Sequence, residues 1–453
     1  MSARKKCAHE ALVEPTLSEG YADSMDSGTT DTPLNVSDGT ALAPGRVSVH
    51  ASRFWRLFPA GMRRRWWMFR PLDLLARYWP VFKKRKGILV IRMDGIGDMV
   101  LFRPSLDHYV AAFGVDQDDI IVLGCHSWGP ITDAVFGGYR VVTIDEHAYA
   151  RRPLYRFRIN LMVRSLAPQV TVCDSYLRRA MMADSLVWVS GAEKTITSMP
   201  YVNEPTRSEF TFYLSQCDEI IDTGPYPTHE IERHFAFVSS IADGPIQATP
   251  LRIDWDQPAP TFADSGPYVL MNPGSNEPGR RWPFESYVTT AEKYLADGYR
   301  VAFVGTRDER WDAALLRDVA QKPGVTDLTG QTTLPELLTL MKYAALVISN
   351  DTGPAHLSIA LGAPTIVVVG GGHFTSFVPY PDHVCPDNAR FVYEVMDCYH
   401  CFWRCHKRTS KHDVFPCVSA ITVDQVWDAS ASLLTSDTRG ARSSHPGTSE
   451  ESA

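Results

Sequence analysis

Two consecutive series of short apolar runs alternate with amphipathic segments, and this alternation constrains the fold more than any other feature of the sequence. The first series lies in residues 87–242 and the second in residues 266–435. Strands that alternate with helices favour a parallel sheet covered on both faces. We therefore expect an α/β protein with two Rossmann-like, doubly wound domains. The runs are GILVIR, IIVLG, VVTID and VTVCD, then YVLMNPG, RVAFVG, VTDLTG, ALVISND and TIVVVGG.

The other segments differ in composition. Residues 243–265 are rich in Pro and Asp, which is typical of an interdomain linker. Residues 1–50 and 436–453 are polar and show no apolar period, so we expect two disordered tails. A chain of 453 residues is long enough for two domains with substantial cores.

A basic, aromatic-rich arm precedes the first domain. Residues 51–86 contain 11 Lys and Arg against the single acid Asp73, although the whole chain has a net charge of −7. Two interpretations are open: a membrane-interface segment, or an arm that packs on the body with its charges solvated. A local basic block on an acidic chain does not predict nucleic-acid binding. The arm holds Trp55, Trp66, Trp67 and Trp79, and we expect Pro59, Pro71 and Pro80 to break it into short helices.

Nothing in the sequence resembles a membrane span or a secretory signal. No apolar run approaches the roughly 20 residues that cross a bilayer, and the N-terminus lacks an apolar h-region. We therefore expect a cytoplasmic protein, peripheral on the inner face of the membrane where the arm binds lipid. Nine Cys in a long chain do not resemble a secreted disulfide framework.

Three predicted strand ends in the second domain carry polar residues. Because the carboxyl ends of parallel strands meet at one edge, these side chains should gather there. Cations, hydroxyls and a helix start suit a diphosphate, and a carboxylate such as Glu309 suits ribose hydroxyls. The residues are Ser275, Arg280 and Arg281; Thr306, Asp308 and Glu309; and Asp351, Thr352 and His356.

The segment DTGPAHLSIALG predicts a helix that begins at Thr352 and Gly353. A helix start carries partial positive charge and free N–H groups, which favour a phosphate. The alternative is an ordinary helix start capped by Asp351 or Thr352, with Pro354 in the first turn.

The first domain carries carboxylates at a strand-to-helix turn, RMDGIGDMV. Val100 occupies the third glycine position of a dinucleotide fingerprint, so that interpretation is weak. Asp98 beside Gly97 suits a general base, with Arg92 and Asp94 nearby. The alternative is that Asp98 only caps the following helix.

Four cysteines, Cys398, Cys401, Cys405 and Cys417, lie near the end of the second domain. Their spacing predicts a structural zinc site, with His400 and His406 as substitute ligands. The alternative is a set of thiols with no ligand, and neither interpretation is catalytic.

The motifs IRMDGIGDMVLFRPSL, NPGS…RRWP, VGTRDE and ISNDTGPAHLSIALG together resemble glycosyltransferase family 9, over roughly residues 87–434. The resemblance implies a GT-B fold with two domains that face a central cleft. It assigns the catalytic base to Asp98, and Arg280, Glu309, Asp351, Thr352, Gly353 and His356 to the nucleotide sugar. From their strand ends we add Ser275 and Thr306 to the donor side, and we expect Arg92, Asp94 and Gly97 on the acceptor side. Pro354 is a mild departure, because heptosyltransferases of the family often have Leu there.

The resemblance also implies an activity: inverting transfer of a sugar, heptose from ADP-heptose in the first place, to a lipopolysaccharide-core or related envelope glycan. No cofactor or metal is required for such a reaction. Two alternatives are open: the same fold acting on another nucleotide sugar for a different polysaccharide, or a sugar-nucleotide-binding protein without catalysis. An NAD-dependent oxidoreductase is disfavoured by the incomplete glycine fingerprint.

Overall fold

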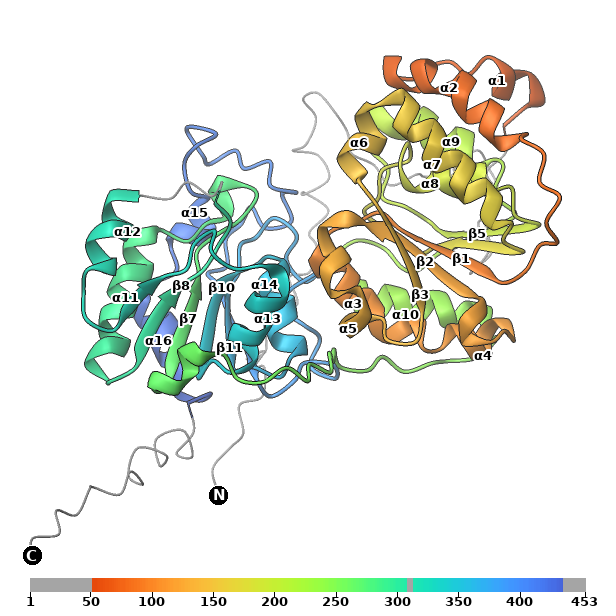
Figure 1. Ribbon diagram of the computed structural model, residues 1–453. Coiled ribbons are helices and arrows are strands. Elements are labelled where there is room, and N and C mark those ends of the chain that lie inside the picture. The colour runs from red at the N-terminus through yellow and green to blue at the C-terminus, as the bar shows by residue number, and fades with distance from the viewer. Residues whose placement is uncertain (1–50, 308–312, 435–453) are drawn as a thin grey trace, which may run out of the picture. The chain divides into compact units, whose positions relative to one another are not determined.

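The computed structural model describes residues 51–307 and 313–434, and the chain separates into two compact units between Thr249 and Pro250 (Figure 1). This boundary falls within residues 243–265, whereas the exact limits of the linker and domains stay predictions. The segments expected to be disordered, residues 1–50 and 436–453, lie outside the described residues.

The first unit is built on a six-stranded parallel sheet with strand order β3-β2-β1-β4-β5-β6. Its central strand β1 is buried at every residue, because a parallel sheet covered on both faces has no solvated side. The strands are β1 (Ile88–Arg92), β2 (Ile120–Cys125), β3 (Arg140–Ile144), β4 (Val170–Cys173), β5 (Lys194–Ser198) and β6 (Glu219–Ile221).

The second unit repeats this plan. Its parallel sheet has the order β12-β11-β10-β7-β8-β9, which is the same arrangement when its strands are counted from β7. The α/β class with two Rossmann-like sheets is therefore confirmed. The strands are β7 (Tyr268–Asn272), β8 (Arg300–Phe303), β9 (Val325–Asp327), β10 (Leu346–Asn350), β11 (Thr365–Val368) and β12 (Ala389–Val392).

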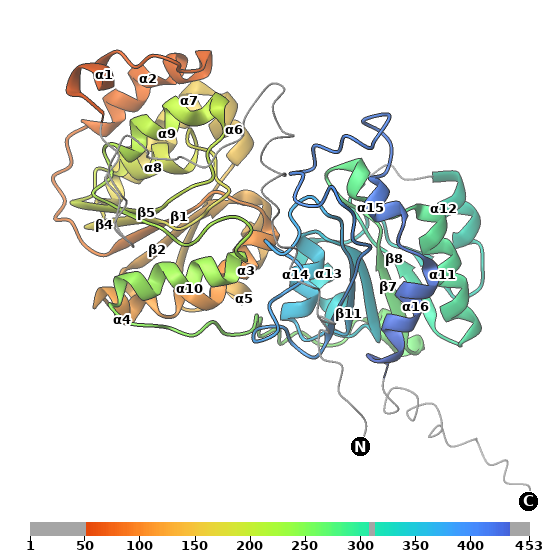
Figure 2. The same ribbon diagram turned by 180° about the vertical axis from the view of Figure 1, so that it is seen from behind.

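Helices cover both faces of each sheet (Figures 1 and 2). In the first unit, α3 (Ile96–Leu106), α4 (Tyr109–Phe113), α5 (Thr132–Val135) and α10 (Glu230–Ile241) cover one face. The other face carries α6 (Glu146–Arg151), α7 (Pro153–Leu166), α8 (Ala183–Ser190) and α9 (Arg207–Leu214).

In the second unit, α13 (Leu334–Lys342) and α14 (Gly353–Ala360) lie on one face of the sheet. The opposite face carries α11 (Phe284–Ala296), α12 (Ala313–Ala320) and α16 (Val423–Ala431), and the short α15 spans Pro416–Ser419. Among the described residues, no helix combines the length and the apolar character that a bilayer crossing needs.

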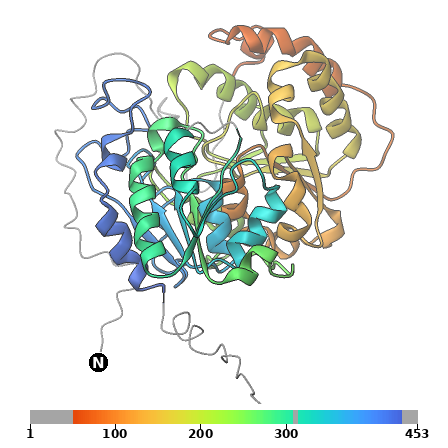
Figure 3. The same cartoon turned by 60° about the vertical axis from the view of Figure 1, so that its left-hand side comes forward.

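The arm forms two helices, α1 (Arg53–Leu57) and α2 (Arg64–Arg77), which lie outermost on the helical layer of the first unit (Figure 3). Pro71 does not break the arm as expected, since it lies inside α2. Pro71 is on the exposed side of that helix, where water can replace the hydrogen bond that its missing N–H removes. Packing of the opposite side against α7 and α8 holds the helix together.

Candidate active site

Both sheets reverse their strand order at one point, between β1 and β4 in the first unit and between β7 and β10 in the second. In open parallel sheets, ligands bind outside the carboxyl ends of the strands at this switch point. Polar residues singled out from the sequence lie there in both units: Asp94 and Asp98 follow β1, and Ser275, Arg280, Asp351 and Thr352 follow β7 and β10. Asp174 and Ser175, which were not singled out, follow β4.

The start of α14 lies directly after β10 and has no side-chain cap. Thr352 occupies the N-cap position with extended backbone, but its hydroxyl donates back to the carbonyl of Asn350 at 3.2 Å. The capping interpretation of the sequence is therefore wrong for Thr352. An uncapped helix start keeps its partial positive charge and its N–H groups available to an anion.

Arg280 lies beside this helix start. Its guanidinium donates to the backbone carbonyl of Asp351 at 2.5 Å and to its carboxylate at 2.9 Å. Its Cζ atom is 4.5 Å from the ring centroid of Trp403. Trp403 fits there because a Cβ at Gly372 would come within 2.1 Å of the indole, so only glycine leaves room for the ring. The packing fixes a cation next to the α14 start.

His356 lies one turn into α14 and is buried. Its Nδ1 is 2.6 Å from the hydroxyl of Tyr380, and its Nε2 is 4.0 Å from the carboxylate of Asp351. Burial lowers the pKa of His356 to about 4, against the opposing effect of Asp351. The ring is therefore neutral at pH 7 and offers a polar nitrogen without adding charge.

Of the remaining residues predicted to bind the donor, the structure describes Ser275 and Thr306 but not Glu309. Ser275 follows β7, and its buried hydroxyl has no hydrogen-bond partner among the described residues. Thr306 follows β8, two residues before the undescribed segment 308–312. Glu309, predicted to hold ribose hydroxyls, lies outside the described residues. The structure thus brings Ser275, Arg280 and the start of α14 to one end of the sheet.

In the first unit, Asp98 lies in the first turn of α3 and is partly exposed. Its carboxylate accepts a hydrogen bond from the backbone N–H of Gly95 at 3.1 Å, so it does cap the helix. Burial, together with the nearby charge of Asp94, raises the pKa of Asp98 to about 7. A capping carboxylate is ordinarily acidic, and a pKa near the operating pH is what a general base needs.

Arg92 lies behind these carboxylates and is wholly buried. It pairs with Asp94 at 2.8 Å and with Asp174 at 2.5 Å, and it donates to the carbonyl of Asp98 at 3.3 Å. These contacts place Arg92 where it orients the turn that contains Gly97. Asp94 is further held by the hydroxyl of Ser175 at 2.8 Å.

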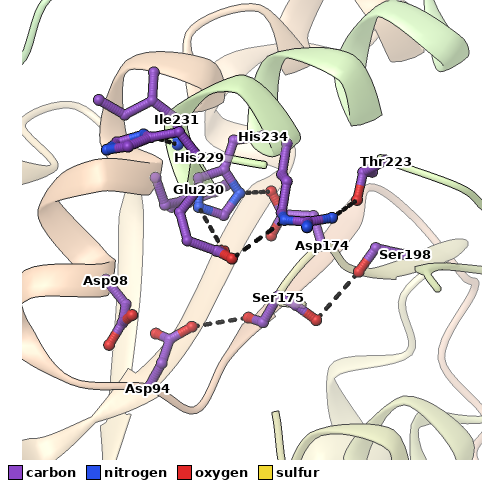
Figure 4. Close-up of polar contacts among 12 residues, drawn as sticks. Asp94, Asp98, Asp174, Ser175, Ser198, Thr223, His229, Glu230, Ile231 and His234 are labelled. Atoms are coloured by element: carbon purple, nitrogen blue, oxygen red, sulfur yellow. Dashed lines mark hydrogen bonds and ion pairs between the residues drawn. The ribbon is translucent and has the colours of Figure 1, made fainter. Parts of the chain in front are cut away.

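Glu230 and His234 of α10 are also buried, and they lie on the same side of Asp174 (Figure 4). His234 Nδ1 is 2.8 Å from the carboxylate of Asp174, and its Nε2 is 3.9 Å from Glu230. Burial and the charge of Asp98 raise the pKa of Glu230 to about 8, so its carboxyl holds a proton at neutral pH. Burial lowers the pKa of His234, so the imidazole is neutral at pH 7 as well.

Sequence reasoning missed Asp174, Glu230 and His234. A signal existed for each of them. Asp174 ends the run VTVCD, as an acid does at many functional strand ends, and HEIERH places two His and two Glu in one helix start. Their significance depends on β1 and β4 being neighbours, which the sequence does not reveal.

The cysteine cluster does not support the predicted zinc site. Cys398, Cys401, Cys405 and Cys417 are free thiols. No group of three or more His, Cys, Asp or Glu in residues 51–307 and 313–434 is placed to hold a metal ion. Cys417 instead accepts a hydrogen bond from the backbone N–H of Gly371 at 3.3 Å. Burial raises the pKa of the Cys417 thiol, and the other three thiols add to the shift.

Two Rossmann-like units with the same strand order, each with polar residues at its switch point, define a GT-B fold. A central cleft between the two domains stays a prediction. The sequence model of glycosyltransferase family 9 (heptosyltransferase) matches residues 215–393. The resemblance to that family is therefore confirmed over this range, which contains Arg280, Asp351 and His356 but not Asp98.

Individual relatives agree with the match. The chain is 29% identical over 120 residues to lipopolysaccharide heptosyltransferase 3 of Escherichia coli, which covers 26% of this chain and 35% of that protein. It is 30% identical over 108 residues to lipooligosaccharide heptosyltransferase 2 of Haemophilus influenzae, covering 23% and 31%. The matches thus span about a third of the length of these relatives.

Solved structures share the fold over most of the chain. A glycosyltransferase family 9 protein from Veillonella parvula superposes with a TM-score of 0.62 at 20% identity, covering 78% of this chain and 99% of that one. Escherichia coli ADP-heptose lps heptosyltransferase II gives 0.56 at 17% identity, covering 77% and 98%. At such identities the likeness establishes the fold.

Proposed function

We propose that this protein is an inverting glycosyltransferase that transfers a sugar, heptose from ADP-heptose in the first place, to a lipopolysaccharide-core or related cell-envelope glycan. The observation that carries the proposal is the uncapped start of α14 beside Arg280. This arrangement suits the diphosphate of a nucleotide sugar, and the family match covers it. The names of the similar proteins favour heptose among the sugars.

Asp98 supplies the chemistry in this proposal. Its carboxylate takes the proton from an acceptor hydroxyl as the oxygen attacks the anomeric carbon. The new C–O bond forms while the bond from that carbon to the diphosphate oxygen breaks. Attack from the opposite side inverts the anomeric centre. The acceptor held by the first unit must therefore reach the donor held by the second.

The leaving group departs as a nucleoside diphosphate with added negative charge. Arg280 and the α14 start meet that charge with a cation and backbone N–H groups, so the proposed reaction uses no metal. Neutral His356 and the buried hydroxyl of Ser275 would bind phosphate or sugar oxygens. Thr306, Glu309, Asp351, Thr352 and Gly353 are assigned to the donor as the sequence predicts.

The acceptor is a glycan carried by a lipid, so we place the reaction in the cytoplasm at the inner face of the cytoplasmic membrane. Arg92, Asp94 and Gly97 are assigned to the acceptor side, where Arg92 acts through Asp94 and the turn. The partners are a nucleotide sugar, a glycolipid and a membrane surface, with no nucleic acid.

A donor screen tests the proposal. Purified full-length protein is incubated with a lipopolysaccharide-core acceptor and ADP-heptose, UDP-sugars or GDP-sugars, and release of the nucleoside diphosphate is measured. We expect turnover with ADP-heptose. Turnover with UDP-sugars alone would replace heptose by another sugar and keep the enzyme class.

Binding must be measured beside turnover, because a non-catalytic sugar-nucleotide-binding protein is the main rival. Calorimetric binding of ADP-heptose without turnover on any acceptor tested would favour that rival. Asp98 argues against it, since a protein that only binds the donor has no need of a base with a pKa of about 7.

A further inference from the structure

Helix α2 has two apolar sides. Trp66, Phe69 and Ala76 are buried on the inner side, where Trp66 packs edge-on against Phe212. The same side buries Asp73, which accepts hydrogen bonds from Arg156 at 2.7 and 2.8 Å. The inner side therefore fixes the arm to the first unit, as one of the two sequence interpretations required.

The outer side of the arm is apolar as well, and nothing in the described residues covers it. Nine of the twelve exposed large apolar side chains found in the described residues lie between Phe54 and Phe82. Trp67 and Leu75 of α2 and its C-cap residue Tyr78 recur at helical spacing on the side opposite Trp66. Exposed apolar side chains gathered in one segment of a water-exposed surface mark an interaction site.

Cations surround this surface. Arg64, Arg65, Lys83 and Lys84 are exposed and form no ion pair among the described residues. The only acid of the arm, Asp73, is buried and neutralised by Arg156. The outer face therefore combines aromatic rings with uncompensated positive charge.

The net charge of the arm distinguishes between two occupants of this surface, a second copy of the chain and an anionic lipid bilayer. The chain carries −7 in total and the arm +10, so the remainder carries −17. A second copy docked arm to arm would bring two strongly positive surfaces together. An anionic bilayer instead receives the cations at its headgroups and the Trp and Tyr rings at the interface.

We propose that the outer face of the arm, residues 53–84, is a docking surface for an anionic lipid bilayer. Only the role of this docking, which is to bring the protein to a lipid-linked acceptor, rests on the proposed function. Binding to lipid is itself independent of turnover. The inner face and the Asp73–Arg156 pair tie this surface rigidly to the unit that carries Asp98.

Vesicle co-sedimentation of the full-length protein tests the proposal. The vesicles are phosphatidylcholine alone or phosphatidylcholine with phosphatidylglycerol, at low and high salt. Wild type should bind the anionic vesicles, and salt should weaken binding. The variant Trp67→Ser/Leu75→Ser/Phe82→Ser should lose about tenfold or more in vesicle affinity, since its apolar anchors are gone.

A matched control is Val395→Ser, which removes an exposed apolar side chain from the second unit and should bind as wild type. Turnover on a soluble acceptor should survive in both variants. Wild type that ignores anionic vesicles, or a triple variant that binds them equally well, overturns the proposal. So does a wild-type dimer that the triple variant splits without lipid binding, which would assign the face to a second copy.

The outcomes separate the two proposals. Vesicle binding without turnover on any donor would remove the glycosyltransferase proposal alone. Turnover without vesicle binding would remove the docking surface alone.

Discussion

The two switch points share a backbone plan and differ in charge. In the first unit the crevice beyond β1 and β4 gathers carboxyl groups, Asp94, Asp98 and Asp174, around the buried Arg92. In the second unit the crevice beyond β7 and β10 gathers Arg280 and the uncapped start of α14. The same sheet order therefore places carboxyl groups at one switch point and a cation with an uncapped helix start at the other, which we propose to act as proton acceptor and anion-binding site.

The helix starts show how this difference arises. At α3 the first turn contains Asp98, whose carboxylate accepts from the backbone N–H of Gly95. At α14 the hydroxyl of the N-cap residue Thr352 turns away to Asn350, and the first turn contains no acid. One helix start therefore carries a carboxylate of its own, and the other carries none. Four predictions test this contrast, in order of decreasing effect.

The largest effect is expected at Asp98. Asp98→Asn should lower turnover about 10²- to 10⁴-fold, because the amide cannot accept the acceptor proton. Binding of the donor nucleotide by calorimetry should be unchanged, since Asp98 belongs to the first unit. Asp118→Asn, an exposed acid of the same unit, serves as the control. Retained turnover in Asp98→Asn would remove the base from the mechanism.

The next effect is expected at Arg280. Arg280→Ala should lower kcat about 10²- to 10³-fold and weaken nucleoside diphosphate binding, because a preorganised positive charge is lost. Arg280→Lys should recover part of kcat, since the charge remains without the forked geometry. Arg252→Ala removes an exposed arginine of the same unit as a control. Unchanged nucleoside diphosphate affinity in Arg280→Ala would contradict an anion-binding site at the start of α14.

A smaller effect concerns pH. Because the pKa of Asp98 is about 7, the base is protonated and inactive below this pH, and kcat/KM should rise with pH and level off above it. Asp94→Asn removes a negative charge that helps to raise this pKa, so the acid limb should move to lower pH. A limb that moves upward or stays fixed would show that Asp98 is not the titrating group.

The smallest effect concerns helix capping. Thr333 caps α13, because its hydroxyl accepts from the backbone N–H of Glu336, so Thr333→Ala should cost about 1 kcal/mol in the free energy of unfolding. Thr352 makes no such bond, so Thr352→Ala should change this free energy by less than about 0.5 kcal/mol. Denaturant unfolding of both variants compares the two positions. An equal loss would indicate that Thr352 does cap α14.

Much of the fold could be predicted from periodicity. The apolar runs correspond to β1 through β4 and β7 through β11, because buried parallel strands are continuous in apolar residues. Three strands were not predicted: β5 (KTITS), β6 (EII) and β12 (ARFV). Each of them is short and mixes polar with apolar residues, so its strand character depends on the neighbours that it pairs with.

The site could be predicted where chemistry and local sequence coincide. Arg280, Asp351 and His356 follow strand ends in obvious motifs, and the structure brings them together. Glu230 and His234 could not be found in this way, because they reach Asp98 and Asp174 only through the packing of α10 beside α3. The zinc prediction is not supported, because no group of three or more His, Cys, Asp or Glu in the described part of the chain is placed to hold a metal ion.

The arm bears on how the protein meets its substrate. Because Asp73 and the inner side of α2 anchor the arm to the first unit, a protein docked by the outer face searches for its acceptor in two dimensions. Its rate would then depend on the mole fraction of acceptor in the bilayer, not on the bulk concentration. Diluting the acceptor with inert lipid should slow the wild type, even when the total amount of acceptor is held constant.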